Sequence, residues 1–509
     1  VVEASGDASL LGKSVTATQG KLSAGGRIEV GATGGGIDAA GLQTQAGAGT
    51  LITAVGGGVA LSGGSSIEAA GDVNISSEGT LDLANATVQS TAGKVELNGL
   101  AGVVAKDATL LAAEAVTVTA NENVEVSNST VEAASLAITA AKSLTGTELK
   151  SKITGAAAFT AGENLVLDSA DLSGGTVSAV AAQGLSALGA AINATEGTLT
   201  LTAEAADIDA SSATLTAKDE VKLTAKQSIT ATEASVEADS LTMTANTGSV
   251  EATGFTATVA GQALVEAGDS VTLDGSKLGL GAFTASAKSG DLSLKSAEVD
   301  ISGAAELTAK QSITATEASV EATSLAMTAE TGSVEASGLT ATVADQASVV
   351  AGDTVVLDNA ELTAGALTAT ANLGDLSMMS AELDISDAAE LTAKQSITAT
   401  DANLTSNSLT MTAVTGKLDG SRLTTTVTGQ ASVEAGDSVT LDGSKLGAGA
   451  LTATANLGDL SLKSAELDIS GAAKLTAQDT ITATDANVTS NSLTMTAKTG
   501  SVEASRLTA

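Results

Sequence analysis

The word LTAKQSITAT begins at Leu223 and recurs at Leu307 and Leu391, and its variant LTAQDTITAT begins at Leu475. These starts are evenly spaced, so residues 223–509 form a tandem array of 84-residue copies whose last copy is truncated. Tandem units of this kind usually stack on their neighbours, and each contributes one slice of a shared core. The period therefore predicts a quasi-one-dimensional fold.

A shorter period lies inside each copy. In residues 307–390 the turn-like words KQSI, TGSV, AGDTV and LGDLS follow one another, at slightly unequal spacings, around Gln311, Gly332, Gly352 and Gly374. The copy therefore contains four rungs of about 21 residues, where a rung is one complete circuit of the backbone. Apolar and polar residues alternate between these words, as at Leu460 and Leu462, and alternation with period 2 indicates strands.

We therefore predict an all-β chain that folds as a parallel β-helix, or β-solenoid, of roughly 24 rungs. Each rung should hold two or three strands of about four to six residues, with Gly, Asn or Asp at the corners. At about 4.8 Å per rung, the result would be an elongated rod about 115 Å long.

The chain is not uniform, although we find no linker in it. Residues 1–137 are Gly-rich, which predicts irregular rungs with tight corners. Residues 138–222 are a degenerate copy, in which ITAAKSLTGTEL from Ile138 matches LTAKQSITATEA with one inserted residue. We expect residues 1–509 to form a single continuous solenoid. Because the chain starts at Val1 and stops within a repeat, we interpret it as an excerpt from a longer protein.

The composition removes most chemical functions. The chain has no Cys, Pro, His, Trp or Tyr, so the commonest neutral-pH base, the thiolate nucleophile and the soft metal ligands are absent. Its aromatic residues are Phe159, Phe255 and Phe283. Phe255 takes the place of Leu339 one copy later, and Phe283 takes the place of Leu367, so we expect both to be core positions.

The charge limits the possible partners. The net charge of −36 disfavours nucleic acid and anionic membrane surfaces, whereas cationic partners or divalent ions would be accommodated more easily. No apolar run reaches the roughly 18 residues of a membrane span. The charge also varies between copies, because residues 307–390 hold 13 acids and one Lys whereas residues 391–474 hold eight acids and six basic residues. Such drift is typical of a solvated face.

Some acidic residues recur at matched positions and are the best candidates for a site. One column consists of Glu233, Glu317, Asp401 and Asp485, a second of Asp269, Asp353 and Asp437, and a third of Asp291, Asp375 and Asp459. The second and third columns follow Gly at corners, and we expect Asp353 and Asp375 to lie on adjacent rungs. Two carboxylates about 5 Å apart could share Ca²⁺. The favoured interpretation is structural, because Asp after Gly often accepts backbone N–H groups in an Asx-type turn.

Two other functions are disfavoured. A polysaccharide-cleaving enzyme would need a cleft with aromatic or Arg side chains, and the chain offers only Arg27, Arg422 and Arg506, the last two replaced by Gly254 and Gly338 in earlier copies. Ice binding could use ranks of Thr from words such as TAT and TVT, but rungs of unequal length would break the regularity that a lattice match needs. We expect no enzyme.

Words such as ALTATANLGDLSLKSAELDIS and AKLTAQDTITATDANVTSNSLTMTA resemble the shafts of large bacterial secreted adhesins of the filamentous-haemagglutinin type, which are exported by two-partner secretion. The resemblance covers most of residues 138–509. It implies a right-handed β-helix in a secreted or cell-surface protein that mediates adhesion or builds a filament, although no secretion domain is recognisable at the start. We expect the partners to be neighbouring cell surfaces, matrix or like chains, with end-to-end or lateral self-assembly. The alternative is a calcium-dependent surface-layer or matrix component.

Overall fold

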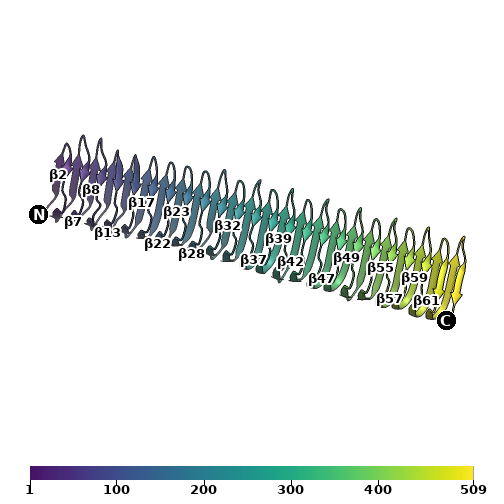
Figure 1. The fold of residues 1–509 in the computed structure, drawn as a ribbon. Coiled ribbons are helices and arrows are strands. Elements are labelled where there is room, and N and C mark those ends of the chain that lie inside the picture. The colour runs from purple at the N-terminus through teal and green to yellow at the C-terminus, as the bar shows by residue number, and fades with distance from the viewer. Residues whose placement is uncertain (508–509) are drawn as a thin grey trace. The chain divides into compact units, whose positions relative to one another are not determined.

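The computed structural model describes residues 1–507, which contain strands and no helix. The chain divides into two compact units, one of Val1–Ala252 and one that begins at Thr253. Within each unit the strands run parallel and pair with strands about 21 residues away, which makes each unit a β-solenoid (Figure 1). The predicted all-β solenoid with about 24 rungs is thus confirmed for the described residues. A single continuous solenoid through residues 1–509 stays a prediction.

A typical rung of the first unit contains three strands of unequal length. In one example, the first strand is β33 (Ile229–Thr230), the second is β34 (Ser235–Ala238) and the third is β35 (Ser240–Ala245). A tight turn separates the first from the second, and a single residue, Asp239, separates the second from the third. Alternate side chains of each strand point into the solenoid and are buried, as the period-2 pattern predicts.

The first strands mark the rungs most clearly. In the unit of residues 1–252 they are β3 (Val15–Thr16), β6 (Ile37–Asp38), β9 (Val59–Ala60), β12 (Thr80–Asp82), β15 (Gly102–Val104), β18 (Val124–Glu125), β21 (Leu144–Thr145), β24 (Leu165–Val166), β27 (Leu185–Ser186), β30 (Ile208–Asp209), β33 and β36 (Val250–Glu251). In the unit from Thr253 they are β38 (Val271–Thr272), β40 (Leu292–Ser293), β43 (Ile313–Thr314), β46 (Val334–Glu335), β48 (Val355–Val356), β50 (Leu376–Ser377), β53 (Ile397–Thr398), β56 (Leu418–Asp419), β58 (Val439–Thr440), β60 (Leu460–Ser461), β62 (Ile481–Thr484) and β64 (Val502–Ser505).

Strand lengths differ from the prediction in two ways. Most first strands have only two residues, and in many rungs of the second unit the second and third strands join into one long strand. These joined strands are β37 (Thr256–Ala267), β39 (Lys277–Ala287), β47 (Thr340–Ala351), β49 (Glu361–Ala371), β57 (Thr424–Ala435), β59 (Lys445–Ala455), β61 (Glu466–Ala477) and β63 (Asn487–Ala497). The register shifts inside several of these pairs, for example between Val259 and Gln262, so a bulge replaces the open corner.

The register of the first strands is constant in the second unit. Val271 pairs with Leu292 and Leu292 with Ile313, and the same step continues without change to the pair Ile481 and Val502. The turn words predict rungs of unequal length, and for the first strands of the second unit this prediction is wrong. The words differ in spacing because they mark slightly different points of the corner. For the second unit this finding removes the regularity argument against ice binding, and ice binding itself stays an untested alternative.

The unit of residues 1–252 has a variable register. The step from Val15 to its partner Ile37 is one residue longer than the constant step of the second unit, whereas the step from Val124 to Leu144 is one residue shorter. The longest step joins Leu185 to Ile208. The preceding step, from Leu165 to Leu185, is one residue shorter than the constant step, and the step from Leu185 to Ile208 is two residues longer, so the two together add the one extra residue of the degenerate copy. The word ITAAKSLTGTEL itself aligns without a gap.

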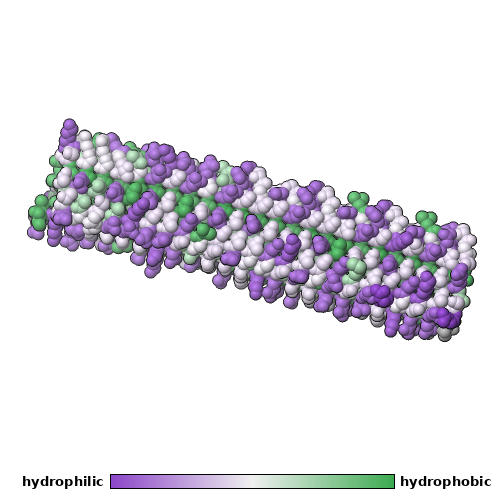
Figure 2. Space-filling model, in the orientation of Figure 1, coloured by the Kyte–Doolittle hydropathy of each residue, from purple (hydrophilic) through white to green (hydrophobic). Residues whose placement is uncertain are grey.

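Small aliphatic side chains and three phenylalanines fill the interior. Phe159, Phe255 and Phe283 are at most 2% exposed, so the predicted place of Phe255 and Phe283 in the core is confirmed. Leu339 and Leu367, which replace two of them in the next copy, are equally buried. On the face seen in Figure 2, residues of intermediate hydropathy and hydrophilic residues predominate, and hydrophobic residues show as a narrow band with isolated protrusions.

Candidate functional site

The third acid column ties neighbouring rungs together. The Oδ1 atoms of Asp291, Asp375 and Asp459 accept hydrogen bonds from the backbone N–H groups of Ser312, Ser396 and Thr480, at 2.8, 2.7 and 2.8 Å. Each donor lies one full step further along the chain and therefore belongs to the next rung. The expectation that these carboxylates accept backbone N–H groups is confirmed, but the N–H belongs to the neighbouring rung and not to the same turn.

The second acid column lies against glycines of the next rung. The backbone carbonyls of Asp269, Asp353 and Asp437 accept hydrogen bonds from the N–H groups of Gly290, Gly374 and Gly458. A Cβ added to these glycines would lie 2.8, 2.6 and 2.8 Å from the Oδ1 atom of the corresponding Asp. Close approach thus explains glycine at these three positions, because side-chain oxygens of the previous rung, the Asp carboxylate among them, occupy the space that a Cβ would take.

These contacts bring the second and third columns together. Asp353 contacts Gly374, which directly precedes Asp375, so the two acids lie on adjacent rungs as predicted. In residues 1–507, no group of three or more Asp and Glu side chains is arranged to hold a metal ion. A calcium site at Asp269, Asp291, Asp353, Asp375, Asp437 and Asp459 therefore stays a prediction.

The first acid column occupies the tight turn of its rung. Glu233, Glu317, Asp401 and Asp485 have φ between 53° and 59°, in the left-handed region that few side chains adopt. The matching residue of the next rung also has positive φ, and it is Gly338 after Glu317 but Arg422 after Asp401 and Arg506 after Asp485. What the column shares is therefore a left-handed backbone conformation at the same point of the turn.

The two arginines bind the acids of the preceding rung. Arg506 Nη2 lies 2.6 Å from Asp485 Oδ2, and the Arg422 guanidinium contacts both carboxylate oxygens of Asp401. The hydrogen bond from Arg422 lowers the pKa of Asp401 below its ordinary value and raises the pKa of Arg422. Between copies, the contacting pair Glu317 and Gly338 is replaced by the pair Asp401 and Arg422, so both members change together. This coupled change indicates a structural ion pair between rungs, here called the staple.

Three further sets of acids recur that the sequence comparison missed, and one of them, which lies on the first strands, consists of Glu251, Glu335, Asp419 and Glu503. The Oδ1 atoms of Asp274, Asp358 and Asp442 accept the hydroxyl groups of Ser293, Ser377 and Ser461 and the backbone N–H groups of Lys295, Met379 and Lys463. The matched words LDGS, LDNA and LDGS would have revealed these three aspartates.

The third missed set lies on the outer face of the second strands. It consists of the pairs Glu298 and Asp300, Glu382 and Asp384, and Glu466 and Asp468. The residue paired with the glutamate changes from Lys277 to Glu361 to Lys445. These acids persist although the charge beside them changes sign.

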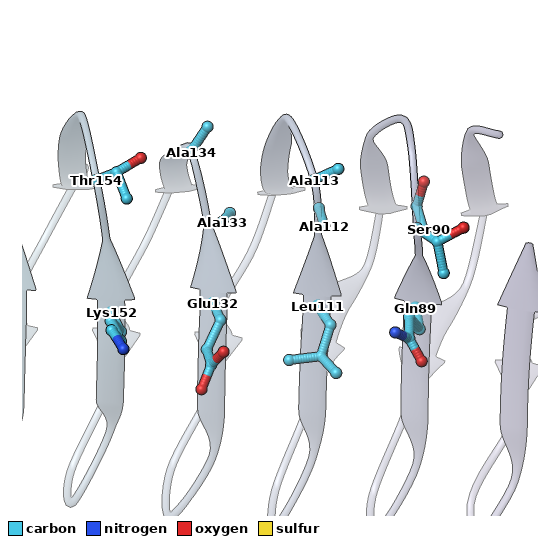
Figure 3. A pocket seen from close by; sticks show the side chains of 11 residues that line it. Gln89, Ser90, Leu111, Ala112, Ala113, Glu132, Ala133, Ala134, Lys152 and Thr154 are labelled. Atoms are coloured by element: carbon cyan, nitrogen blue, oxygen red, sulfur yellow. The ribbon is translucent and has the colours of Figure 1, made fainter. Parts of the chain in front are cut away.

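An open groove lies over four rungs of the first unit (Figure 3). It runs across the outer face of the second strands of these rungs, which are β13 (Thr87–Ser90), β16 (Thr109–Ala112), β19 (Thr130–Ala133) and β22 (Lys150–Ile153). Gln89, Leu111, Glu132 and Lys152 stand side by side on these strands, and alanines line the adjacent corner. The groove has a volume of about 460 Å³ and is open to solvent.

A polar cleft of about 460 Å³ lies at the tight turns of the second unit. It is lined by Lys295, Ser296, Thr314, Thr316, Glu317 and Glu335. Both hollows are open to solvent. Neither hollow includes an acid of the second or third column.

Comparison with known proteins gives no assignment, because no family model, curated protein or solved structure matches the chain. The described residues include no helix able to cross a membrane.

Proposed function

We propose that this chain is the repetitive shaft of a secreted or cell-surface protein, which acts mechanically as an adhesive stalk or filament and carries out no catalysis. The constant register of the second unit is the observation that supports this most directly. It makes each 84-residue copy a module of four identical steps, so that adding or removing copies changes length alone.

The behaviour of the exposed residues supports the same proposal. Glu390 and Lys474 occupy the same position in successive copies and point outward from their strands. A repeated catalytic or ligand site would require the same charge at that position in each copy. A shaft requires only that its buried residues and its rung-to-rung contacts persist. Both persist between the copies, together with exposed acids such as Glu298 and Asp300 and their counterparts.

Deletion of residues 307–390 tests the modular part of the proposal. The deletion joins Glu306 to Leu391 and so recreates the junction that Glu390 and Leu391 form in the intact chain. We expect the shortened chain to unfold at the same temperature as the intact chain and to lose about 19 Å of length, four rungs at about 4.8 Å. The matched control deletes residues 307–380, which is not a whole number of rungs and should disrupt folding. Equal stability of the two deletions would contradict the proposal.

The adhesive part needs a separate measurement. Cells that display the intact chain should attach to a surface or to one another more than cells without it. Deletion of one copy should reduce attachment only when the shortened chain is too short to reach the opposite surface. If display of the folded chain leaves attachment unchanged, the adhesive role is wrong even when the modular behaviour holds. Fractionation of the native host would test the extracellular location.

A calcium-dependent surface-layer or matrix component is the second candidate. It is favoured by the three acid pairs on adjacent rungs, of which Asp353 and Asp375 are one. Two carboxylates provide at most four of the six to eight oxygen ligands that Ca²⁺ takes, so water or a second chain would have to supply the rest. Melting curves with Ca²⁺ and with a chelator should differ if this candidate is right, and identical curves would eliminate it.

A further inference from the structure

We draw no further inference here: the strongest candidate, the open groove along β13, β16, β19 and β22 in the unit of residues 1–252, places Gln89, Leu111, Glu132 and Lys152 side by side next to an alanine-lined corner, but nothing in the structure shows what covers it.

Discussion

The two units build the same rung with different regularity. In residues 1–252 the step between first strands varies, from the short step of Val124 to Leu144 to the long step of Leu185 to Ile208, whereas from Val271 to Val502 it is constant. The paired strands are parallel in both units, so the variation falls in the corners. The inward alternation of apolar residues therefore specifies the fold, and repetition of the copies adds the constant register.

The largest expected effect concerns the aromatic core positions. Phe159→Ala in the first unit and Phe283→Ala in the second should each lower the free energy of unfolding by about 3–5 kcal/mol, because each removes a fully buried ring. Phe283→Leu should cost less than about 1.5 kcal/mol, since Leu367 occupies the matched position. Hydrogen exchange would show which rungs open first. Loss of protection confined to the unit that carries the substitution would support the division into two compact units, and equal loss in both would support the single continuous solenoid that the sequence predicts.

The next effect compares corner glycines of the two units. A Cβ at Gly374 would lie 2.6 Å from Asp353 Oδ1, whereas the nearest atom to a Cβ at Gly184 is Asn164 Oδ1 at 3.4 Å. Gly374→Ala should therefore destabilise the second unit by about 1–3 kcal/mol through overpacking, and Gly184→Ala should be almost neutral. Chemical denaturation measures both. A neutral Gly374→Ala would show that Asp353 moves aside freely, and the close-approach explanation of this corner would then be wrong.

A smaller effect tests the hydrogen bonds between corners. Asp375 accepts the N–H of Ser396 in the second unit, and Asn164 accepts the N–H of Gly184 in the first. Because a neutral amide already does this in residues 1–252, Asp375→Asn should retain most stability, whereas Asp375→Ala should cost about 1–2 kcal/mol. Asn164→Ala is the matched control in the other unit. A large loss in Asp375→Asn would show that the negative charge itself matters, which is what a calcium site requires.

Removal of buried hydroxyl groups should raise stability, in contrast to the substitutions above. Thr425 in the second unit and Ser151 in the first point into apolar surroundings, and neither side-chain oxygen has a hydrogen-bond partner among residues 1–507. Thr425→Val and Ser151→Ala should each stabilise the protein by about 1 kcal/mol, because an unsatisfied polar atom is removed. Thermal unfolding would detect the gain. A loss of stability would instead point to a bound water on that hydroxyl.

The sequence predicts much of the fold because its information is local and repeated. The alternation at Leu460 and Leu462 and the substitution of Phe283 by Leu367 identify inward positions without any knowledge of the turns. The corners are harder to predict, because their geometry depends on contacts with the neighbouring rung. Nothing in the residues around Asp375 indicates that its partner is the N–H of Ser396, and the role of Asp274 likewise lies in its bonds to Ser293 and Lys295 of the next rung.

The smallest effect concerns the staple of Asp401 and Arg422, which Glu317 and Gly338 replace one copy earlier. The arginine lowers the pKa of Asp401 in the folded protein, so the ion pair contributes stability above the ordinary carboxyl pKa. This contribution is lost as the pH falls through the lowered value. Arg422→Gly should return the pKa of Asp401 to its ordinary range in an NMR titration, with only a small change in melting temperature at neutral pH, because exposed ion pairs contribute little. Adding Asp401→Glu recreates the earlier copy and should leave the register unchanged. A shift of register in that double variant would mean that the staple, and not the apolar alternation, aligns these rungs.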